Sequence, residues 1–431
     1  MNAISRDDHR RRMLFVSTRY LFPVDSGGKI RTTQILRGLK GGRYSATLVS
    51  PAPPDWRDRH GSEIVAVCDR FVAWPEPRRH ALFHYTRLVN LVSRLPVPVA
   101  TDRSQAGMRT IATELAQQPD IFVLDFAHAA VLVPPNVRCP TVVFTHNLEA
   151  EIFQRHSRHA RQLPIRALWL NQHGKMMRFE GDVLRRADGV VAVSERDAQA
   201  MRRDYGCTNV ATIRTGVDLE FFTYGRKPVG RSVVFMGAMD WMPNADGIRT
   251  FLTDVWPLIV ARVPDATMTV VGRAPPQGLV RQFERTGSAV RFTGLVDDVR
   301  PYVRESAVFV IPLRIGGGTR LKVYEAMALG CPVVSTPLGV EGLPVEPDTH
   351  CLTVEIGASM AEAIVRLLCD TERQESLSRA ARTFVEQNCS FCAAASDFEA
   401  ICNRVVESAG ASGPAQTTVA APKARFAAGQ P

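Results

Sequence analysis

The sequence lacks the long apolar segments that membrane spans and export signals require. No stretch approaches the roughly 18 consecutive apolar residues of a transmembrane helix. The N-terminal segment MNAISRDDHRRRMLFVS is charged, and its apolar run is shorter than the apolar core of a secretory signal peptide. We therefore expect a cytoplasmic protein, with peripheral contact at the inner face of the plasma membrane left open.

Several ligand-binding signatures are absent as well. Neither GxxxxGK[ST] nor GxGxxG occurs, which argues against a P-loop nucleoside triphosphatase and against a dinucleotide-binding enzyme. No DxD triplet offers two carboxylates to a divalent metal. The nine cysteines are odd in number and scattered, and Cys389 and Cys392 form a lone CxxC. We therefore expect reduced thiols, no metal site and no cofactor.

The composition that remains is globular, and its charge is uneven. With 431 residues, 45% of them hydrophobic and 22% charged, the chain can bury the cores of two or three domains. The formal charge is +10, but residues 1–215 hold 32 Lys and Arg against 20 Asp and Glu, whereas residues 216–431 hold 21 against 23. This asymmetry predicts that the first half faces an anionic partner such as lipid headgroups, nucleic acid or a polyanionic substrate.

Apolar runs rich in β-branched residues alternate with helical patterns along the chain. Because strands that are apolar throughout are buried on both faces, this alternation predicts parallel sheets covered by helices, in a doubly wound α/β fold of two units. The predicted strands are residues 13–17, 46–50, 121–125, 141–145, 189–194, 210–214, 232–237, 267–272, 290–294, 307–312 and 332–336. Predicted helices close the chain at 360–370, 372–388 and 393–406.

A change of domain is predicted where Gly, Pro and charged residues precede a new apolar strand, near residues 212–232. The last segment is rich in Ala, Gly and Pro and has little to bury, which predicts disorder. The predicted parts are a flexible N-terminus (1–11), a first α/β domain (12–214), a second α/β domain (215–390), a helix that returns to the first domain (391–407) and a disordered tail (408–431).

Ligands of open α/β sheets bind at the carboxyl ends of the strands, and two loops of the first half carry candidate residues there. Gly27 and Gly28 can expose backbone N–H groups to an oxyanion, although a glycine-capped turn accounts for them equally well. His146 follows a predicted strand directly, and His128 follows another that ends at Asp125. Such a histidine can donate to a hydroxyl or phosphate oxygen, accept a proton, or serve the structure alone.

The segment RIGGGTRLKVYEAMALGCPVV, from residue 314, carries the strongest pattern in the second half. Backbone donors, a helix start and two cations together are typical of a diphosphate site, and Glu325, further along, can accept from two ribose hydroxyls. An ordinary helix start is the alternative. The candidate residues are Gly317, Gly318, Thr319, Arg320 and Lys322.

The loop MGAMDWMPNADG follows the first strand of the second half. Gly237 permits close approach of the backbone, and Asp240, Trp241 and Asn244 can shape a pocket. Alone, this segment is equally typical of an ordinary loop.

The block RIGGGTRLKVYEAMALGCPVVSTPLGVEGL resembles the family-four retaining glycosyltransferases, which have the GT-B architecture of two Rossmann-like domains facing a central cleft. The likeness extends to the early GG loop, VVAVSERDAQAM and TGVDLEFF. HNLEAE and MGAMDWMPNADG resemble the branch that makes exopolysaccharides.

The resemblance implies that a nucleotide-sugar lies mainly on the second domain and that Glu325 binds its ribose. A glutamate that many members carry eight residues earlier is replaced here by Gly317. The Arg and Lys that usually follow the first strand of this domain are missing from MGAMDWMPN, so we infer that Arg320 and Lys322 supply their charge.

In the first domain the resemblance brings Gly27 and Gly28 close to the donor phosphate or the acceptor, and turns His146 toward the transferred sugar. The implied activity is that of a metal-independent, retaining hexosyltransferase of exopolysaccharide or cell-surface polysaccharide biosynthesis. Its implied donor is a UDP- or GDP-sugar, its acceptor is a glycan or a polyprenyl-diphosphate-linked glycan, and nucleic acid is not a partner. No paired carboxylates for double displacement are evident, so the leaving diphosphate is expected to accept the proton of the acceptor.

Arg10–Arg12 and the segment 155–186 are candidate contacts with anionic lipid, because arginines alternate there with Leu, Ile, Trp and Met. An Arg-rich solvated helix face gives the same pattern. Two alternatives on the same scaffold are a nucleotide-sugar epimerase and an inverting transferase. A more remote one is a nucleic-acid-binding or scaffold protein that uses the basic half.

Overall fold

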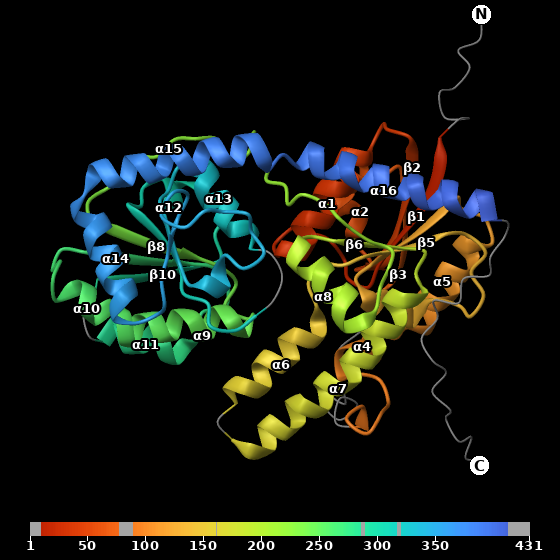
Figure 1. Ribbon diagram of the computed structural model, residues 1–431, viewed down its shortest axis with the longest axis horizontal. Helices are drawn as coiled ribbons and strands as arrows, with labels where there is room; N and C mark the ends of the chain where they lie inside the picture. Colours follow the sequence, from red (N-terminus) through yellow and green to blue (C-terminus); the bar gives the residue numbers. More distant parts are fainter. Residues whose placement is uncertain (1–9, 77–88, 161, 286–288, 317–319, 413–431) are drawn as a thin grey trace, which may run out of the picture. The chain divides into compact units, whose positions relative to one another are not determined.

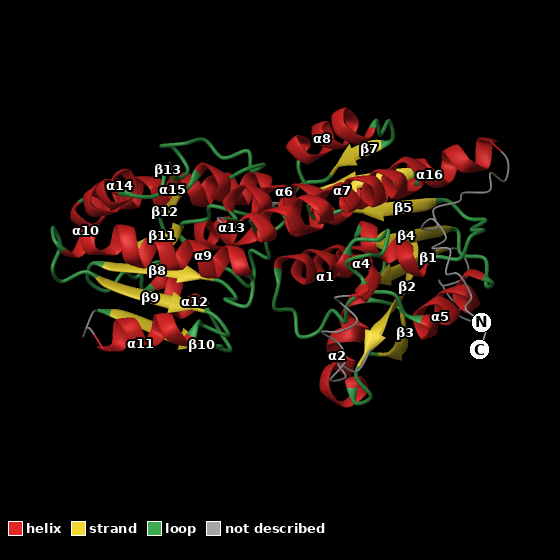
Figure 2. Ribbon diagram, turned by 90° about the horizontal axis from the view of Figure 1, so that it is seen from below, coloured by secondary structure: helices red, strands yellow, loops and turns green. Residues whose placement is uncertain are grey.

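The computed structural model describes residues 10–76, 89–160, 162–285, 289–316 and 320–412 (Figure 1). The chain forms two compact units: unit 1 comprises Met1–Ile213 with Cys392–Pro431, and unit 2 comprises Arg214–Phe391. Each unit is built around one parallel sheet with helices on its faces (Figure 2). The predicted fold of two doubly wound α/β units is confirmed.

The sheet of unit 1 has seven strands in the order β3-β2-β1-β4-β5-β6-β7. The chain starts in the middle of the sheet and moves to one edge, then returns to β4 and moves to the other, which is the Rossmann pattern of winding. The strands are β1 (Arg11–Ser17), β2 (Tyr44–Ala52), β3 (Arg70–Pro75), β4 (Ile121–Asp125), β5 (Thr141–Phe144), β6 (Gly189–Ala192) and β7 (Val210–Thr212).

The sheet of unit 2 has six strands in the order β10-β9-β8-β11-β12-β13 and repeats that winding. Its carboxyl edge therefore also has a switch point, between β8 and β11, where α/β proteins bind ligands. The strands are β8 (Ser232–Met236), β9 (Thr267–Val271), β10 (Val290–Gly294), β11 (Val308–Ile311), β12 (Val333–Ser335) and β13 (Leu352–Thr353).

Helices connect the strands and cover both faces of each sheet. Those of unit 1 are α1 (Gly27–Leu39), α2 (Trp56–Val67), α4 (Val97–Thr101), α5 (Gln105–Leu115), the 3-10 helix η2 (Ala127–Leu132), α6 (Glu149–His159), α7 (Leu163–Arg186), α8 (Glu195–Tyr205) and α16 (Phe391–Ser412). Those of unit 2 are α9 (Met242–Thr250), the π-helix η3 (Phe251–Val255), α10 (Trp256–Val260), α11 (Gln277–Arg285), α12 (Arg300–Arg304), α13 (Leu321–Leu329), the 3-10 helix η4 (Pro337–Gly339), α14 (Ala358–Cys369) and α15 (Thr371–Asn388). None of the described helices is long and apolar enough to cross a bilayer.

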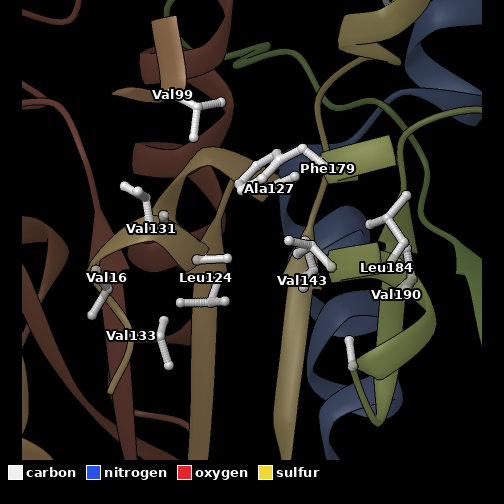
Figure 3. Packing of buried hydrophobic residues seen from close by; sticks show 14 of the residues in the cluster. Val16, Val99, Leu124, Ala127, Val131, Val133, Val143, Phe179, Leu184 and Val190 are labelled. Atoms are coloured by element: carbon white, nitrogen blue, oxygen red, sulfur yellow. The ribbon is translucent and has the colours of Figure 1, made fainter. Parts of the chain in front are cut away.

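The core of unit 1 lies on both faces of its sheet. Successive side chains of a strand point to opposite faces, so Leu14 of β1 packs in one apolar cluster and Phe15 in the other. Figure 3 shows Leu124, Val143 and Val190, from three neighbouring strands, in the first of these clusters. Burial on both faces is the physical reason that the strands are apolar throughout.

The second cluster of unit 1 includes residues from the end of the described chain. Phe398 and Cys402 of α16 are fully buried against β1 and β5, and the ring of Phe398 lies 5.2 Å from that of Phe144. Asn403 accepts hydrogen bonds from the Tyr44 hydroxyl (2.8 Å) and the Arg11 guanidinium (3.1 Å). Helix α16 is thus part of the core of unit 1.

Two strands and two boundaries differ from the prediction. The edge strands β3 and β13 were not predicted, because β3 is half-exposed and β13 has only two residues, so neither has a long apolar run. Strand β1 begins at Arg11, inside the predicted flexible N-terminus, because the Arg11 N–H donates to Arg43 O at 2.9 Å. Helix α16 extends to Ser412, beyond the predicted start of the tail, since Ala-rich sequence favours helix.

We expect Phe398→Ala to destabilise unit 1 by about 3–5 kcal/mol, the usual cost of removing a buried aromatic ring. The measurement is the urea midpoint for loss of unit 1 structure, with Leu295→Ala as the control, because Leu295 is an exposed residue of unit 2. An unchanged midpoint for Phe398→Ala would show that α16 is not part of this core.

Candidate functional site

The candidate site of unit 2 lies at the carboxyl edge of its sheet, where α13 starts next to the end of β8. The Lys322 ammonium donates hydrogen bonds to the Met236 carbonyl (3.0 Å) and to Asn244 Oδ1 (2.9 Å). Asn244 in turn donates to the Ala238 carbonyl at 2.8 Å. The predicted cation of the GGGTRLK segment thus reaches the loop MGAMDWMPN, which has no cation of its own.

Gly237 is the residue that makes this approach possible. A Cβ at position 237 would lie 2.6 Å from Asn244 Nδ2 and 2.9 Å from Lys322 Nζ. These distances are shorter than real Cβ contacts, so any side chain here would displace the amide or the ammonium. The group that comes close to the backbone of Gly237 is therefore the Lys322 ammonium.

Arg320 lies beside Lys322 and is also buried. Its guanidinium lies over the Trp241 ring, 5.4 Å from the ring centroid, and a Cβ at Gly316 would lie 2.8 Å from Arg320 Nη2. The aromatic face and the bare backbone of Gly316 hold the guanidinium in place. The predicted residues Gly317, Gly318 and Thr319 lie outside the described residues.

The two ionisable groups of α13 are held where their charged forms are costly. Burial, and then the nearby Arg320, lowers the pKa of Lys322 to about 7, while Glu325 acts in the opposite direction. Burial raises the pKa of Glu325 to about 7, against the effect of Lys322. An anion that reached Lys322 would stabilise its ammonium form, and hydroxyl donors would stabilise the carboxylate of Glu325.

Other charged residues near this loop are already paired. Asp240 accepts from Arg273 Nε at 3.0 Å, so its carboxylate holds the loop after β9. Asp246 forms two hydrogen bonds of 3.0 Å with the Arg314 guanidinium. These pairs shape the loops, whereas the buried residues Arg320, Lys322 and Glu325 are the ionisable groups suited to a ligand.

Unit 1 contains a buried polar network at the same edge of its own sheet. His146 Nε2 lies 2.8 Å from Asp125 Oδ1, and Asp125 also accepts from the hydroxyls of Ser17 and Thr32, both at 2.9 Å. The register pairs Ser17 of β1 with Asp125 of β4, which brings these side chains together. The Arg31 guanidinium lies 3.4 Å from the other ring nitrogen of His146.

The GG loop is linked to His146 through Phe126. The Phe126 ring stacks on the His146 ring with centroids 4.2 Å apart, and a Cβ at Gly28 would lie 2.9 Å from Phe126 Cζ. Phe126 has a φ of 68°, a conformation that costs energy in a bulky residue. Gly27 and Gly28 start α1, and Lys29 forms an ion pair with Asp25 at 3.1 Å. At least one role of Gly28 is therefore to admit the Phe126 ring.

The two histidines of this region are in different protonation environments. Burial lowers the pKa of His146 and outweighs the Asp125 carboxylate, so the ring is neutral and donates from Nε2 to Asp125. Burial also acts to lower the pKa of His128, but the hydrogen bond with Asp102 (3.0 Å) and the negative charges of Glu149 and Asp102 together outweigh it, and the pKa is raised. Asp125 therefore partners His146 and not the nearer residue in sequence, His128.

A carboxylate of α7 fixes the segment that follows His146. Glu180 accepts from the backbone N–H groups of Glu149 (2.9 Å) and Ala150 (3.2 Å), and from the Tyr205 hydroxyl (2.7 Å). Burial raises the pKa of Glu180 to about 7. The N–H groups at the start of α6 are thus satisfied from within the protein.

Three residues were not predicted: Ser17 and Thr32, which donate to Asp125, and Asp102, which pairs with His128. Ser17 ends a strand next to the one that ends in Asp125, and adjacent parallel strands end at the same edge. That signal was available in the sequence. The pairing of Asp102 with His128 was not, because it depends on how the helical segment α4 folds back.

We expect Glu325→Gln to stabilise unit 2 at pH 8 and not at pH 5. The native pKa is about 7 against an ordinary value of 4.5, so the folded protein holds an extra proton between these values and loses stability as the pH rises through them. The shift corresponds to roughly 3 kcal/mol, which the neutral amide would recover. The measurement is the melting temperature at both pH values.

The control for this substitution is Glu355→Gln, because Glu355 is an exposed carboxylate of the same unit. It should leave the melting temperature unchanged at either pH. An equal effect of Glu325→Gln at pH 5 and pH 8 would contradict the buried, ionisation-dependent role.

We expect the His146 ring to be neutral at pH 6.5, the ordinary pKa of a histidine, because burial lowers its pKa. Nitrogen NMR of ring-labelled protein distinguishes the tautomers, and the proton should reside on Nε2. Protonation of His146 above pH 6.5 would contradict the assignment.

Two glycosyltransferase family models match the chain. Residues 26–221 match the model described as glycosyltransferase family 4, and residues 230–370 match the model described as glycosyl transferases group 1. The phosphatidyl-myo-inositol mannosyltransferase of Mycobacterium tuberculosis is 29% identical over 157 residues, which is 35% of this chain and 40% of that protein. The curated relatives that match are covered over 40% to 50% of their own length.

Solved structures of similar fold cover nearly the whole chain. Sucrose-phosphate synthase from Thermosynechococcus elongatus superposes with a TM-score of 0.69 at 18% identity, over 93% of this chain and 100% of that one. Anabaena HepE in complex with UDP and glucose gives 0.63 at 16% identity, over 93% and 99%. These likenesses establish the fold. The matches to the two glycosyltransferase models and the fold of these structures together support a glycosyltransferase with the GT-B fold.

Proposed function

We propose that the protein transfers a sugar, with retention of configuration, from a nucleotide-sugar to a glycan or lipid-linked acceptor. The observation that carries this proposal is the buried ammonium of Lys322 at the end of β8, with Arg320 and Glu325 on the same segment. Burial makes the charged forms of Arg320, Lys322 and Glu325 costly. One ligand can stabilise all three, because its diphosphate pairs with the two cations and its vicinal hydroxyls donate to the carboxylate.

The donor in this proposal is a UDP- or GDP-sugar. Arg320 and Lys322 bind its diphosphate, Glu325 accepts from its ribose, and Gly237 leaves the space in which Lys322 reaches the end of β8. HepE, a structure of similar fold, is described in complex with UDP and glucose, which supports a donor of this class. The residues Gly317, Gly318 and Thr319 are proposed as further donor contacts.

Catalysis consists largely of stabilising charge on the leaving group. As the bond between sugar and phosphate breaks, negative charge grows on the diphosphate, and the ammonium of Lys322 and the guanidinium of Arg320 stabilise it. The acceptor hydroxyl forms the new bond on the same face of the sugar and passes its proton to the departing phosphate oxygen. With two cations in place, we propose that no divalent metal is needed.

The buried polar network of unit 1 around His146 and Asp125 is proposed to face the transferred sugar rather than to move a proton. His146 is neutral, and both of its ring nitrogens have partners within 3.4 Å, so it suits orienting a hydroxyl through small rearrangements of this network. The glycines of the GG loop, Gly27 and Gly28, keep the start of α1 open for an oxyanion.

The acceptor is proposed to bind to unit 1, the basic part of the chain, in cell-surface or exopolysaccharide biosynthesis at the inner face of the plasma membrane. A mannosyltransferase named for phosphatidyl-myo-inositol is among the relatives, and another relative is named for the cps region of Klebsiella pneumoniae. Both names support an acceptor on a lipid or in a surface polysaccharide.

We expect Lys322→Met to lower turnover by about 10²-fold or more, because one charge stabiliser of the leaving group is lost. The measurement is release of UDP or GDP from a panel of nucleotide-sugars with membrane-extracted acceptors. Lys227→Met, at an exposed lysine of the same unit, is the matched control and should keep full activity.

Unchanged turnover of Lys322→Met would contradict the assignment. Conversion of the donor without an acceptor would favour the epimerase alternative. The anomeric coupling of the product in proton NMR distinguishes retention from inversion.

A further inference from the structure

Helices α6 and α7 form a hairpin that extends beyond the sheet of unit 1. Figure 1 shows the two helices side by side, with the turn between them far from the strands. The base of the hairpin is packed, since Met176, Phe179 and Val183 of α7 are buried in the core. The far end, from Arg158 to Leu170, is mostly exposed. We call the described residues of this stretch the hairpin tip.

The hairpin tip exposes an unusual amount of apolar surface. Of the fifteen large hydrophobic residues that are exposed in the described chain, four lie within eight residues of α7. They are Leu163 (77% exposed), Ile165 (42%), Leu168 (40%) and Leu170 (48%). Such a concentration on a soluble surface indicates a surface that contacts something else.

These residues include a stripe on the side of α7 that points away from the core. Leu163, Ala167, Leu170 and Gly174 follow one another at helical spacing of three or four residues, and we call them the outer stripe. A Cβ at Gly174 would meet nothing within 4 Å, which places this side of the helix in open space. The outer stripe is therefore a second apolar face, separate from the one that holds α7 in the core.

The charged residues of the outer part of the hairpin are all basic. Residues 152–179 contain six Lys and Arg and no Asp or Glu. Arg158, Arg166 and Arg178 are exposed. At 3.6 residues per turn, Arg166 and Arg178 lie about 60° to either side of the outer stripe. Guanidinium groups thus border an apolar strip on both sides.

We propose that the hairpin tip docks on an anionic bilayer surface, with the outer stripe entering the headgroup boundary. The observations favour lipid over a protein groove, because apolar residues surrounded by arginines and free of acids match a phosphate-bearing surface with an apolar layer beneath it. Arginine pairs with phosphate oxygens, and leucine enters the acyl boundary. That the bilayer also carries a lipid-linked acceptor rests on the proposed function. Docking on the bilayer does not depend on that function.

The test is co-sedimentation of the full chain with vesicles of phosphatidylcholine, either pure or with about a third of phosphatidylglycerol, a content that gives the surface a negative potential. The wild type should prefer the anionic vesicles. Leu163→Glu with Leu170→Glu should lower its partition coefficient at least about tenfold. Arg158→Gln with Arg166→Gln should lower it about fivefold per arginine, on anionic vesicles only.

The matched control is Leu295→Glu, at a leucine of unit 2 that is 74% exposed, and it should bind as the wild type does. Equal binding of the double leucine variant, equal loss in the control, or no preference for anionic lipid would overturn the proposal. A vesicle-free dimer that the double leucine variant dissociates would assign the tip to a second copy instead. Nucleotide binding is measured separately without vesicles, so its failure would count against the proposed function alone.

Discussion

The burial of Lys322 against the end of β8 is the constraint on which the candidate donor site depends. An ammonium in this position needs oxygen partners, and the Met236 carbonyl and Asn244 provide them only because Gly237 leaves the space. Burial of the charged forms is costly, and it shifts the pKa values of Lys322 and Glu325 to about 7. A core built for stability alone would contain neither group. Buried ionisable groups that destabilise the folded protein are typical of a functional site, because a bound ligand can offset the free-energy cost of their burial.

The two units use buried charge in different ways. In unit 1 Asp125 is surrounded by donors from β1, from α1 and from the loop after β5, and His146 is neutral, so the hydrogen bonds of this carboxylate are made before any ligand arrives. In unit 2 Arg320 and Lys322 are brought to one edge, and burial lowers the pKa of Lys322, so an anion at this edge would stabilise its ammonium form. The excess positive charge of the chain lies in the first half, yet the candidate site cations of the second half, Arg320 and Lys322, are buried. Net charge therefore describes the surface of unit 1 better than it describes the donor site.

The fold was largely predictable because strands buried on both faces must be apolar, and every such run formed a strand. Edge strands such as β3 escape this rule, since one side of them faces solvent. Lys322 lies against MGAMDWMPN, the loop whose missing charge it is inferred to supply, and that role stays a prediction. The segment 155–186 could be predicted as a candidate lipid contact, but the pairing of Asp125 with His146 and the exposed side of α7 could not, because they depend on which strands are neighbours and on where α7 leaves the core.

The most direct test of the central claim is a thermal-shift panel of UDP-, GDP- and ADP-sugars on the wild type and on a variant that combines Lys322→Met with Glu325→Gln. A ligand that binds only the folded protein stabilises it by RT ln(1 + [L]/Kd), so the melting temperature rises with the ratio of ligand concentration to Kd. The account predicts that at least one nucleotide-sugar stabilises the wild type and that none stabilises the variant, although the variant itself is folded. Equal stabilisation of both proteins would contradict the assignment of the donor site to Lys322 and Glu325.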